Sequence, residues 1–73
     1  RSQRMTAEKK AELKRLVKLK LLAEKAETSL QYLSLIINNH RSCSLDLAEK
    51  LARSANMLQS ELIFSPLDFM RNN

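Results

Sequence analysis

No glycine occurs among the 73 residues of this chain, and its one proline, Pro66, lies near the C-terminus. Glycine supplies most of the positive-φ turns of β-hairpins and most phosphate-binding loops, so both kinds of structure are disfavoured here. Leucine, serine, lysine, alanine, glutamate and arginine dominate the composition, and all of these except serine strongly favour helix. The sequence therefore predicts an all-α fold, formed as a single domain over residues 1–73.

A hydrophobic core of this size is marginal and usually needs a disulfide, a metal or a partner chain. The one cysteine, Cys43, excludes a disulfide within the chain. The one histidine, His40, is the only other soft ligand, and a structural zinc site needs four. We therefore expect no metal and no cofactor, and we expect self-association or a partner chain to supply the missing stability.

Apolar residues recur at helical spacing through the first half of the chain, at Leu19, Leu22, Ala26, Leu30, Leu33 and Ile37. Spacings of three and four predict one long helix over residues 7–38. Residues 1–6 are expected to be disordered, or residues 1–4 to be a remnant of cloning, because Met5 can serve as a start. The longest uninterrupted apolar runs are three residues, so no membrane span is predicted.

A second series of apolar residues at helical spacing predicts a helix over residues 44–64, with Ser42 or Ser44 at its start. This series consists of Leu47/Ala48, Leu51, Ala55, Leu58 and Leu62. The sequence Ser65-Pro66-Leu67-Asp68 predicts a short helical turn over residues 66–71, because serine favours the N-cap and proline the first helical position.

A connection of about 4–6 residues forces two long helices antiparallel. At about 1.5 Å per residue the first helix would be roughly 48 Å long and the second roughly 30 Å, which leaves residues 7–18 unpaired. The predicted architecture is thus an antiparallel helical hairpin, completed by dimerisation into a helical bundle or covered by its own C-terminal tail. The predicted association surface consists of Leu13, Leu16, Val17, Phe64, Leu67, Phe69 and Met70.

Positive charge is concentrated at one end of the chain. Residues 1–25 carry nine lysines and arginines against three glutamates, whereas residues 26–73 carry four against five carboxylates, within a net charge of +5. On a continuous helix the lysines would form one stripe, with Tyr32 further along it as a stacking face. The predicted surface for nucleic acid or an acidic partner consists of Lys10, Lys14, Arg15, Lys18, Lys25 and Tyr32.

The sequence favours a non-enzymatic helical interaction module, regulatory or adaptor in role, that binds a protein partner or a second copy of itself. Its carboxylates are expected at the exposed edges of the helices, beside lysines and arginines, so no catalytic site and no small-molecule substrate are predicted. The alternative is a small basic nucleic-acid-binding regulator, although no zinc finger, homeodomain, RRM or glycine-containing helix-turn-helix corner is present. An anionic membrane surface is a third, less favoured partner, and an intracellular location, cytoplasmic or nuclear, is expected.

Overall fold

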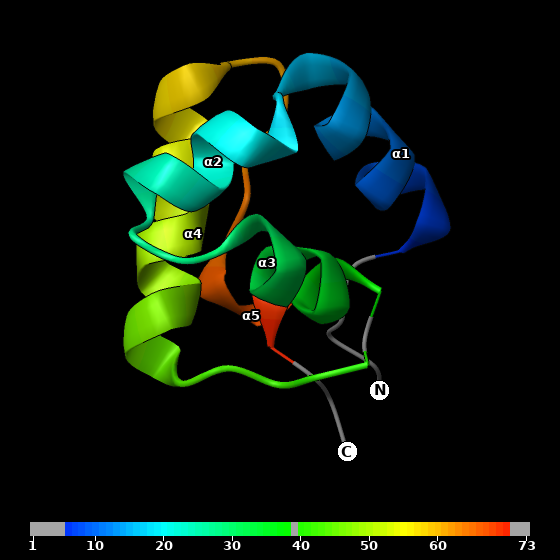
Figure 1. The fold of residues 1–73 in the computed structure, drawn as a ribbon. Coiled ribbons are helices and arrows are strands. Elements are labelled where there is room, and N and C mark those ends of the chain that lie inside the picture. The colour runs from blue at the N-terminus through cyan, green and yellow to red at the C-terminus, as the bar shows by residue number, and fades with distance from the viewer. Residues whose placement is uncertain (1–5, 39, 71–73) are drawn as a thin grey trace.

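Five helices form the regular structure of residues 6–38 and 40–70, which are the residues described by the computed structural model of this chain (Figure 1). In chain order the helices are α1 (Ala7–Leu16), α2 (Leu19–Lys25), α3 (Leu30–Ile37), α4 (Leu45–Leu58) and α5 (Pro66–Phe69). No strand occurs in these two ranges, which confirms the predicted all-α class. None of the helices described combines the length and the apolar character that crossing a membrane requires.

The segment predicted as one helix over residues 7–38 is three helices, so the predicted hairpin of two long helices is wrong. A continuous helix of that length would extend roughly 48 Å, whereas the longest principal dimension of the fold is 28 Å. The chain turns back twice and buries Leu13 and Val17, which the hairpin would have left uncovered. Burial of apolar side chains, rather than local helix propensity, thus decides where the first helix ends.

The first break lies at Val17 and Lys18, whose backbone angles are both extended. The Val17 amide still donates to the Leu13 carbonyl at 2.9 Å and so closes the last turn of α1. Extended angles are open to every residue type, so this break needs neither glycine nor proline. The Val17 side chain at this break is almost completely buried in the core.

The second predicted long helix is confirmed at its start. Ser44 caps α4, and its hydroxyl accepts the Leu47 amide at 3.3 Å. The predicted end near residue 64 is wrong, because α4 ends at Leu58. Asn56 pairs with both backbone groups of Phe64: its side chain accepts the Phe64 amide at 2.8 Å and donates to the Phe64 carbonyl at 2.9 Å.

Gln59 holds the segment after α4 in the same way. Its side chain accepts the Leu62 amide at 3.0 Å and donates to the Leu62 carbonyl at 2.8 Å. Amide side chains that bond to nearby backbone groups offer the chain an alternative to helix. Residues 59–65 are therefore not helical, yet the backbone amide and carbonyl groups of Leu62 and Phe64 are still hydrogen-bonded.

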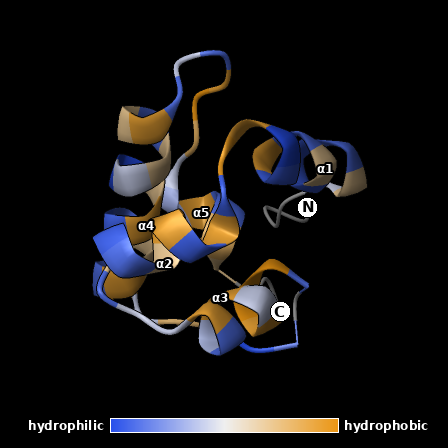
Figure 2. Cartoon of the chain, turned by 45° about the horizontal axis from the view of Figure 1, so that its top comes forward, coloured by the Kyte–Doolittle hydropathy of each residue, from blue (hydrophilic) through white to orange (hydrophobic). Residues whose placement is uncertain are grey.

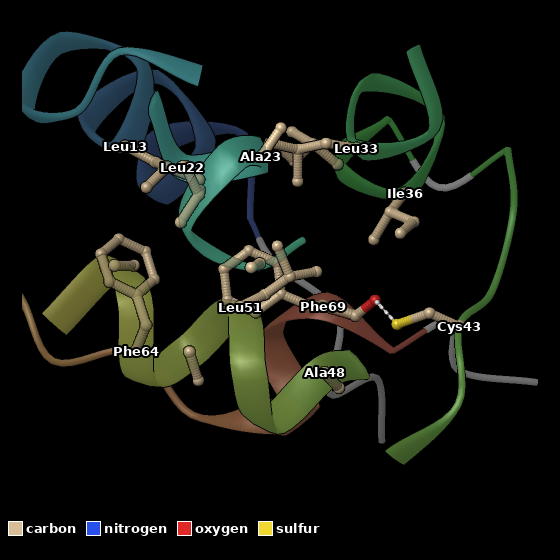
Figure 3. Close-up of a cluster of buried hydrophobic side chains, with 14 of the residues drawn as sticks. Leu13, Leu22, Ala23, Leu33, Ile36, Cys43, Ala48, Leu51, Phe64 and Phe69 are labelled. Atoms are coloured by element: carbon tan, nitrogen blue, oxygen red, sulfur yellow. Dashed lines mark hydrogen bonds between the residues drawn. The ribbon is translucent and has the colours of Figure 1, made fainter. Parts of the chain in front are cut away.

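The core is built around α4, against which α2 and α5 both pack. The buried residues of α4 are Ala48, Leu51, Ala52, Ser54 and Ala55. All of them except Leu51 are small, which lets the neighbouring helices approach α4 closely. Figure 2 shows apolar residues of α2, α4 and α5 meeting in the middle of the fold. Figure 3 shows Leu13, Leu22 and Leu33 gathered opposite Phe64 and Phe69, whose ring centroids lie 6.1 Å apart.

Capping side chains define both ends of the described fold. Thr6 accepts the Lys9 amide at 3.1 Å and starts α1, so the disorder predicted for residues 1–6 is wrong for Thr6, and residues 1–5 lie outside the described residues. The predicted C-terminal helical turn is present as α5 and begins at Pro66 as expected, but it ends at Phe69 rather than at residue 71. The Asp68 carboxylate accepts the Ser65 amide at 2.8 Å, as the sequence Ser65-Pro66-Leu67-Asp68 predicts.

Candidate functional site

A tight corner of four residues, 26–29, joins α2 to α3. The Thr28 amide donates to the Ala23 carbonyl at 2.8 Å, and the Glu27 amide donates to the Glu24 carbonyl at 3.1 Å. These two bonds form the Schellman motif that ends many helices, whose central residue is left-handed and usually glycine. Here that residue is Glu27, with a φ of 62°.

Ser29 starts α3 directly after this corner. Its backbone is extended, and its hydroxyl accepts the Tyr32 amide at 3.0 Å. The chain reverses within these four residues, so that α3 packs beside α2 (Figure 1). Two packed helices joined by a turn of this length occur both in αα-hairpins and in helix-turn-helix motifs. The sequence analysis did not predict this corner because it looked for a glycine, whereas the adjacent Thr28 and Ser29, both poor in helix interiors, are the signal that marks the break.

The second helix of this unit has one buried face and one exposed face. Leu33, Ile36 and Ile37 point into the core and are almost completely buried. The opposite face carries Gln31, Ser34 and Leu35, of which Ser34 is half-buried and the others are exposed. We call these three residues the outer face of α3.

A shallow groove runs beside the outer face of α3. It is lined by Ser29, Gln31, Tyr32, Ser34, Leu35 and Arg41. Of the described residues in this lining, Arg41 alone carries a charge. The groove therefore combines an amide, hydroxyls and an apolar side chain with one guanidinium group.

Hydrogen bonds attach the segment that carries Arg41 to α3. The Tyr32 hydroxyl donates to the Ser42 carbonyl at 3.1 Å. The amides of His40 and Arg41 both donate to the Leu35 carbonyl, at 2.9 and 3.3 Å. These three bonds hold the Arg41 backbone at the C-terminal end of α3, while its side chain remains exposed.

The lysines and the tyrosine predicted to form one stripe are distributed over three helices. Lys14 is exposed on α1, Lys18 lies directly before α2, and Tyr32 lies on α3. Lys10 approaches α3 from α1, because its ammonium group donates to the Asn38 side-chain oxygen at 3.1 Å. The Tyr32 ring is half-buried and its hydroxyl is bonded to Ser42, so it acts as an anchor in this structure.

Lys25 lines a second depression, away from the groove. This depression also contains Glu27, Lys50, Arg53, Ser54 and Met57. The Lys50 ammonium group lies 3.5 Å from the Glu27 carboxylate. Arg15, the remaining predicted basic residue, is exposed and its guanidinium pairs with Glu12 at 2.6 Å, and the contact with Glu12 raises the pKa of Arg15.

Four of the seven residues of the predicted association surface lie in the core: Leu13, Val17, Phe64 and Phe69. Leu16 and Met70 are half-buried against that core, and Leu67 is exposed. The C-terminal tail thus covers Leu13 within the same chain. Of the two predicted ways to cover Leu13, dimerisation or the tail, this is the one that needs no partner. These buried residues are available to a partner only if the helices separate.

Cys43 and His40 do not face a common point. The Cys43 thiol is buried and donates to the Phe69 carbonyl at 3.5 Å (Figure 3), and this burial raises its pKa. His40 is exposed. Cys43 therefore serves as a small apolar residue of the core that links the segment after α3 to α5.

Comparison of the chain with protein-family models, with curated proteins and with solved structures gave no significant match. The proposals below rest on the geometry of α2, α3, α4 and the segment that carries Arg41.

Proposed function

We propose that this chain is a non-enzymatic DNA-binding domain that places α3 in the major groove of duplex DNA. The observation that carries the proposal is the corner at residues 26–29, which packs α3 against α2 and leaves the outer face of α3 uncovered. In helix-turn-helix proteins the second helix enters the major groove while the first crosses the backbone. An α-helix with side chains is about 10–12 Å across, and the major groove is about 12 Å wide.

Charge around α3 supports an anionic partner. Arg41 lies at the C-terminal end of the helix, and the Lys10 ammonium group reaches Asn38 at the same end. Lys18 and Lys20 extend from the start of α2 and are exposed. Lysine and arginine side chains near a recognition helix are the groups that neutralise DNA phosphates.

Binding to a fluorescently labelled duplex of mixed sequence tests the proposal. We expect fluorescence anisotropy at low salt to show saturable binding that weakens steeply as salt is added, because counterions are released from the phosphates. Arg41→Gln is expected to weaken binding and to reduce the log–log salt slope by about one. The matched control, Arg53→Gln, removes the same charge from the second depression and is expected to change the slope little. Absence of binding at low salt, or equal effects of the two variants, would overturn the proposal.

We also propose that two copies of the chain associate, as the sequence predicts, but through a surface that keeps only Leu67 of the residues predicted for it. Ile63 and Met57 are 77% and 65% exposed, the largest values among the exposed large apolar side chains described. Leu67, from the predicted association surface, is exposed as well. Duplex DNA presents its grooves at regular helical spacing, so two associated copies would bind two half-sites one helical turn apart.

Sedimentation velocity tests self-association. Wild type is expected to shift toward a dimer as concentration rises, and Ile63→Asp is expected to remain monomeric. The control, Leu45→Asp, introduces the same charge at another exposed leucine, at the start of α4, and is expected to leave the dimer intact. A wild-type monomer at every concentration at which the duplex is bound would contradict dimerisation but not DNA binding.

A further inference from the structure

The depression that contains Lys25 lies where α2 packs against α4, and it carries an excess of positive charge. Lys50 and Arg53 are three positions apart on α4, so they project from one face of that helix. Lys25, in the last turn of α2, lines the same depression. The one carboxylate of the described lining belongs to Glu27. Three cations and one carboxylate give this lining a net charge of +2.

The fold makes little use of these cations. Among the ion pairs of residues 6–38 and 40–70, only the contact of Lys50 with Glu27 joins two members of the depression. It is 3.5 Å long and both side chains are more than half exposed, so it contributes little to stability. Neither Lys25 nor Arg53 belongs to an ion pair described for these residues. The corner at residues 26–29 already satisfies two carbonyl groups at the end of α2, so that end does not need the cations either.

Ser54 adds a hydroxyl group to the lining. It follows Arg53 on α4 and is 6% exposed, and it is the one buried polar residue of the part of the chain that the structure describes. No hydrogen bond described there involves its hydroxyl group, yet no fully buried side-chain oxygen or nitrogen in that part lacks a partner. The Ser54 hydroxyl therefore reaches solvent, and the depression is the hollow that Ser54 lines. A hydroxyl group in this position is available to donate a hydrogen bond to a ligand.

We propose that this depression binds a phosphate monoester. At neutral pH a phosphate monoester has a charge of about −1.5 to −2 and three strong acceptor oxygens. This matches a lining of charge +2 whose donors are two ammonium groups, a guanidinium group and a hydroxyl group. A guanidinium group binds phosphate through two parallel hydrogen bonds. A carboxylate ligand would compensate only half of the lining charge.

The size of the depression also favours a single phosphate group as the part that is recognised. Its volume is about 250 Å³. Pockets that bury most of a small ligand have volumes of about 300–1,000 Å³. The depression therefore holds the phosphate group itself and leaves most of the molecule that carries it in solvent.

This site is separate from the proposed DNA-binding surface and does not depend on it. The DNA backbone consists of phosphate diesters, each with one negative charge. A diester is expected to bind the depression more weakly than a monoester, because it compensates less of the lining charge. Arg53 and Arg41 line different hollows. Arg53→Gln is therefore expected to weaken binding of a monoester and to have little effect on binding of duplex DNA.

Titration with inorganic phosphate at low salt, followed by NMR of the backbone amides, tests the proposal. We expect saturable shifts centred on the four lining residues that supply the donors, namely Lys25, Lys50, Arg53 and Ser54. A titration with sodium chloride at the same ionic strength is the control, and dimethyl phosphate provides the diester. Shifts that do not saturate, that also arise with chloride, or that spread evenly over the exposed lysines of α1 and α2 would overturn the proposal. Equal affinity for the diester would also overturn it.

Two variants remove donors from the site. Arg53→Gln is expected to weaken phosphate binding about tenfold, the effect of losing a hydrogen bond to a charged group. Ser54→Ala is expected to weaken it about fivefold, and alanine maintains the helix. The matched control, Arg15→Gln, removes the same charge from an exposed arginine on α1 and is expected to leave phosphate binding unchanged. Circular dichroism checks that each variant is folded, and equal losses in Arg53→Gln and Arg15→Gln would contradict a specific site.

Glu27→Gln gives the sharpest test, because it is expected to improve binding. It removes the carboxylate from the lining and releases Lys50 from its contact at 3.5 Å. We expect phosphate to bind about three- to fivefold more tightly, in keeping with the strength of an exposed ion pair. Cations that serve only to keep the surface soluble would show no such gain. Unchanged or weaker binding by a folded Glu27→Gln variant would overturn the proposal.

Competition against inorganic phosphate identifies the source of the monoester. The two competitors are glycerol 3-phosphate and a short peptide that contains phosphoserine, and glycerol and the unphosphorylated peptide are the controls. Tighter binding of glycerol 3-phosphate indicates a small phosphorylated molecule, whereas tighter binding of the peptide indicates a phosphorylated protein segment. Equal binding shows that the phosphate group alone is recognised, and all three results support the site. Failure of both competitors to displace inorganic phosphate overturns the proposal and leaves the DNA-binding function untouched.

Discussion

Lys9 and Asp68 lie 59 residues apart in the sequence, and the Lys9 ammonium group donates to the Asp68 carboxylate at 2.9 Å. The same ammonium group lies 5.0 Å from the centroid of the Phe64 ring. The same carboxylate oxygen accepts the Ser65 amide at the start of α5. One ion pair therefore fastens α1 to α5 and supports the cap of α5.

Removing this ion pair is expected to destabilise the fold. Lys9→Met keeps most of the aliphatic stem and should lower the free energy of unfolding by about 1 kcal/mol, since the pair is partly buried and hydrogen-bonded. The control is Lys50→Met, which removes the exposed contact with Glu27 and should cost at most about 0.5 kcal/mol. Urea unfolding followed by circular dichroism measures both, and equal effects would contradict a special role for Lys9.

Glu27→Gly is expected to stabilise the protein. A non-glycine residue in the left-handed region costs roughly 1–2 kcal/mol, and glycine removes that cost but gains freedom in the unfolded chain. We expect a net increase of about 0.5–1 kcal/mol in the free energy of unfolding, while Glu27→Val should decrease it. Glu49→Gly, within α4, should lower stability by about 1 kcal/mol and serves as the control. A destabilising Glu27→Gly would argue against the corner at residues 26–29.

The Cys43 thiol is expected to make stability depend on alkaline pH. Burial raises the pKa of Cys43 in the folded state, so the folded chain holds this proton more tightly than the unfolded chain. The contribution of this proton to the free energy of unfolding is complete below the ordinary thiol pKa of about 8.5. It is lost as pH rises through the pKa of Cys43 in the folded state. Cys43→Ala should remove this part of the pH dependence in urea unfolding measured from neutral to alkaline pH. A thiol that reacts with Ellman's reagent in the folded protein as fast as in urea would contradict its burial.

Phe69 and Leu67 are two residues apart in α5 and should respond differently to truncation. Phe69 is 1% exposed, so Phe69→Ala is expected to lower the free energy of unfolding by about 3–5 kcal/mol, which is enough to unfold a small domain. Leu67 is 49% exposed, so Leu67→Ala should change it by about 0.5 kcal/mol or less. Thermal unfolding distinguishes the two, and a stable Phe69→Ala variant would show that α5 does not belong to the core.

Local signals in the sequence predicted helix starts better than helix ends. Ser65 was predicted as a cap, Ser44 was one of two predicted caps beside Ser42, and both Ser44 and Ser65 precede helices, because capping depends on bonds within a few residues. The end of α4 was placed too late, because the bonds from Asn56 to Phe64 cross eight residues and have no sequence period. The break at Val17 was not predicted, because it depends on burial and uses angles open to any residue.

The same apolar periodicity fits one continuous helix and two helices joined by a corner, and this explains why the helical hairpin was predicted wrongly. The residues from Leu19 to Ile37 keep helical spacing across the corner, so α2 and α3 look like one helix. The corner was hidden because Glu27 occupies a position where glycine is usual. The groove beside α3 could not be predicted either, because it depends on the hydrogen bonds from the His40 and Arg41 amides to the Leu35 carbonyl, which no sequence pattern records.

The amino-acid sequence by itself determined that the chain is helical, where two of its helices begin and that its positive charge lies at one end. These properties depend on composition and on interactions a few residues apart, which any compact arrangement would share. Only the tertiary structure decided that the N-terminal segment breaks into three helices and exposes one face of α3. Apolar side chains such as Leu13 and Val17 are removed from water only when segments distant in sequence cover them, and no local pattern records which segments those are.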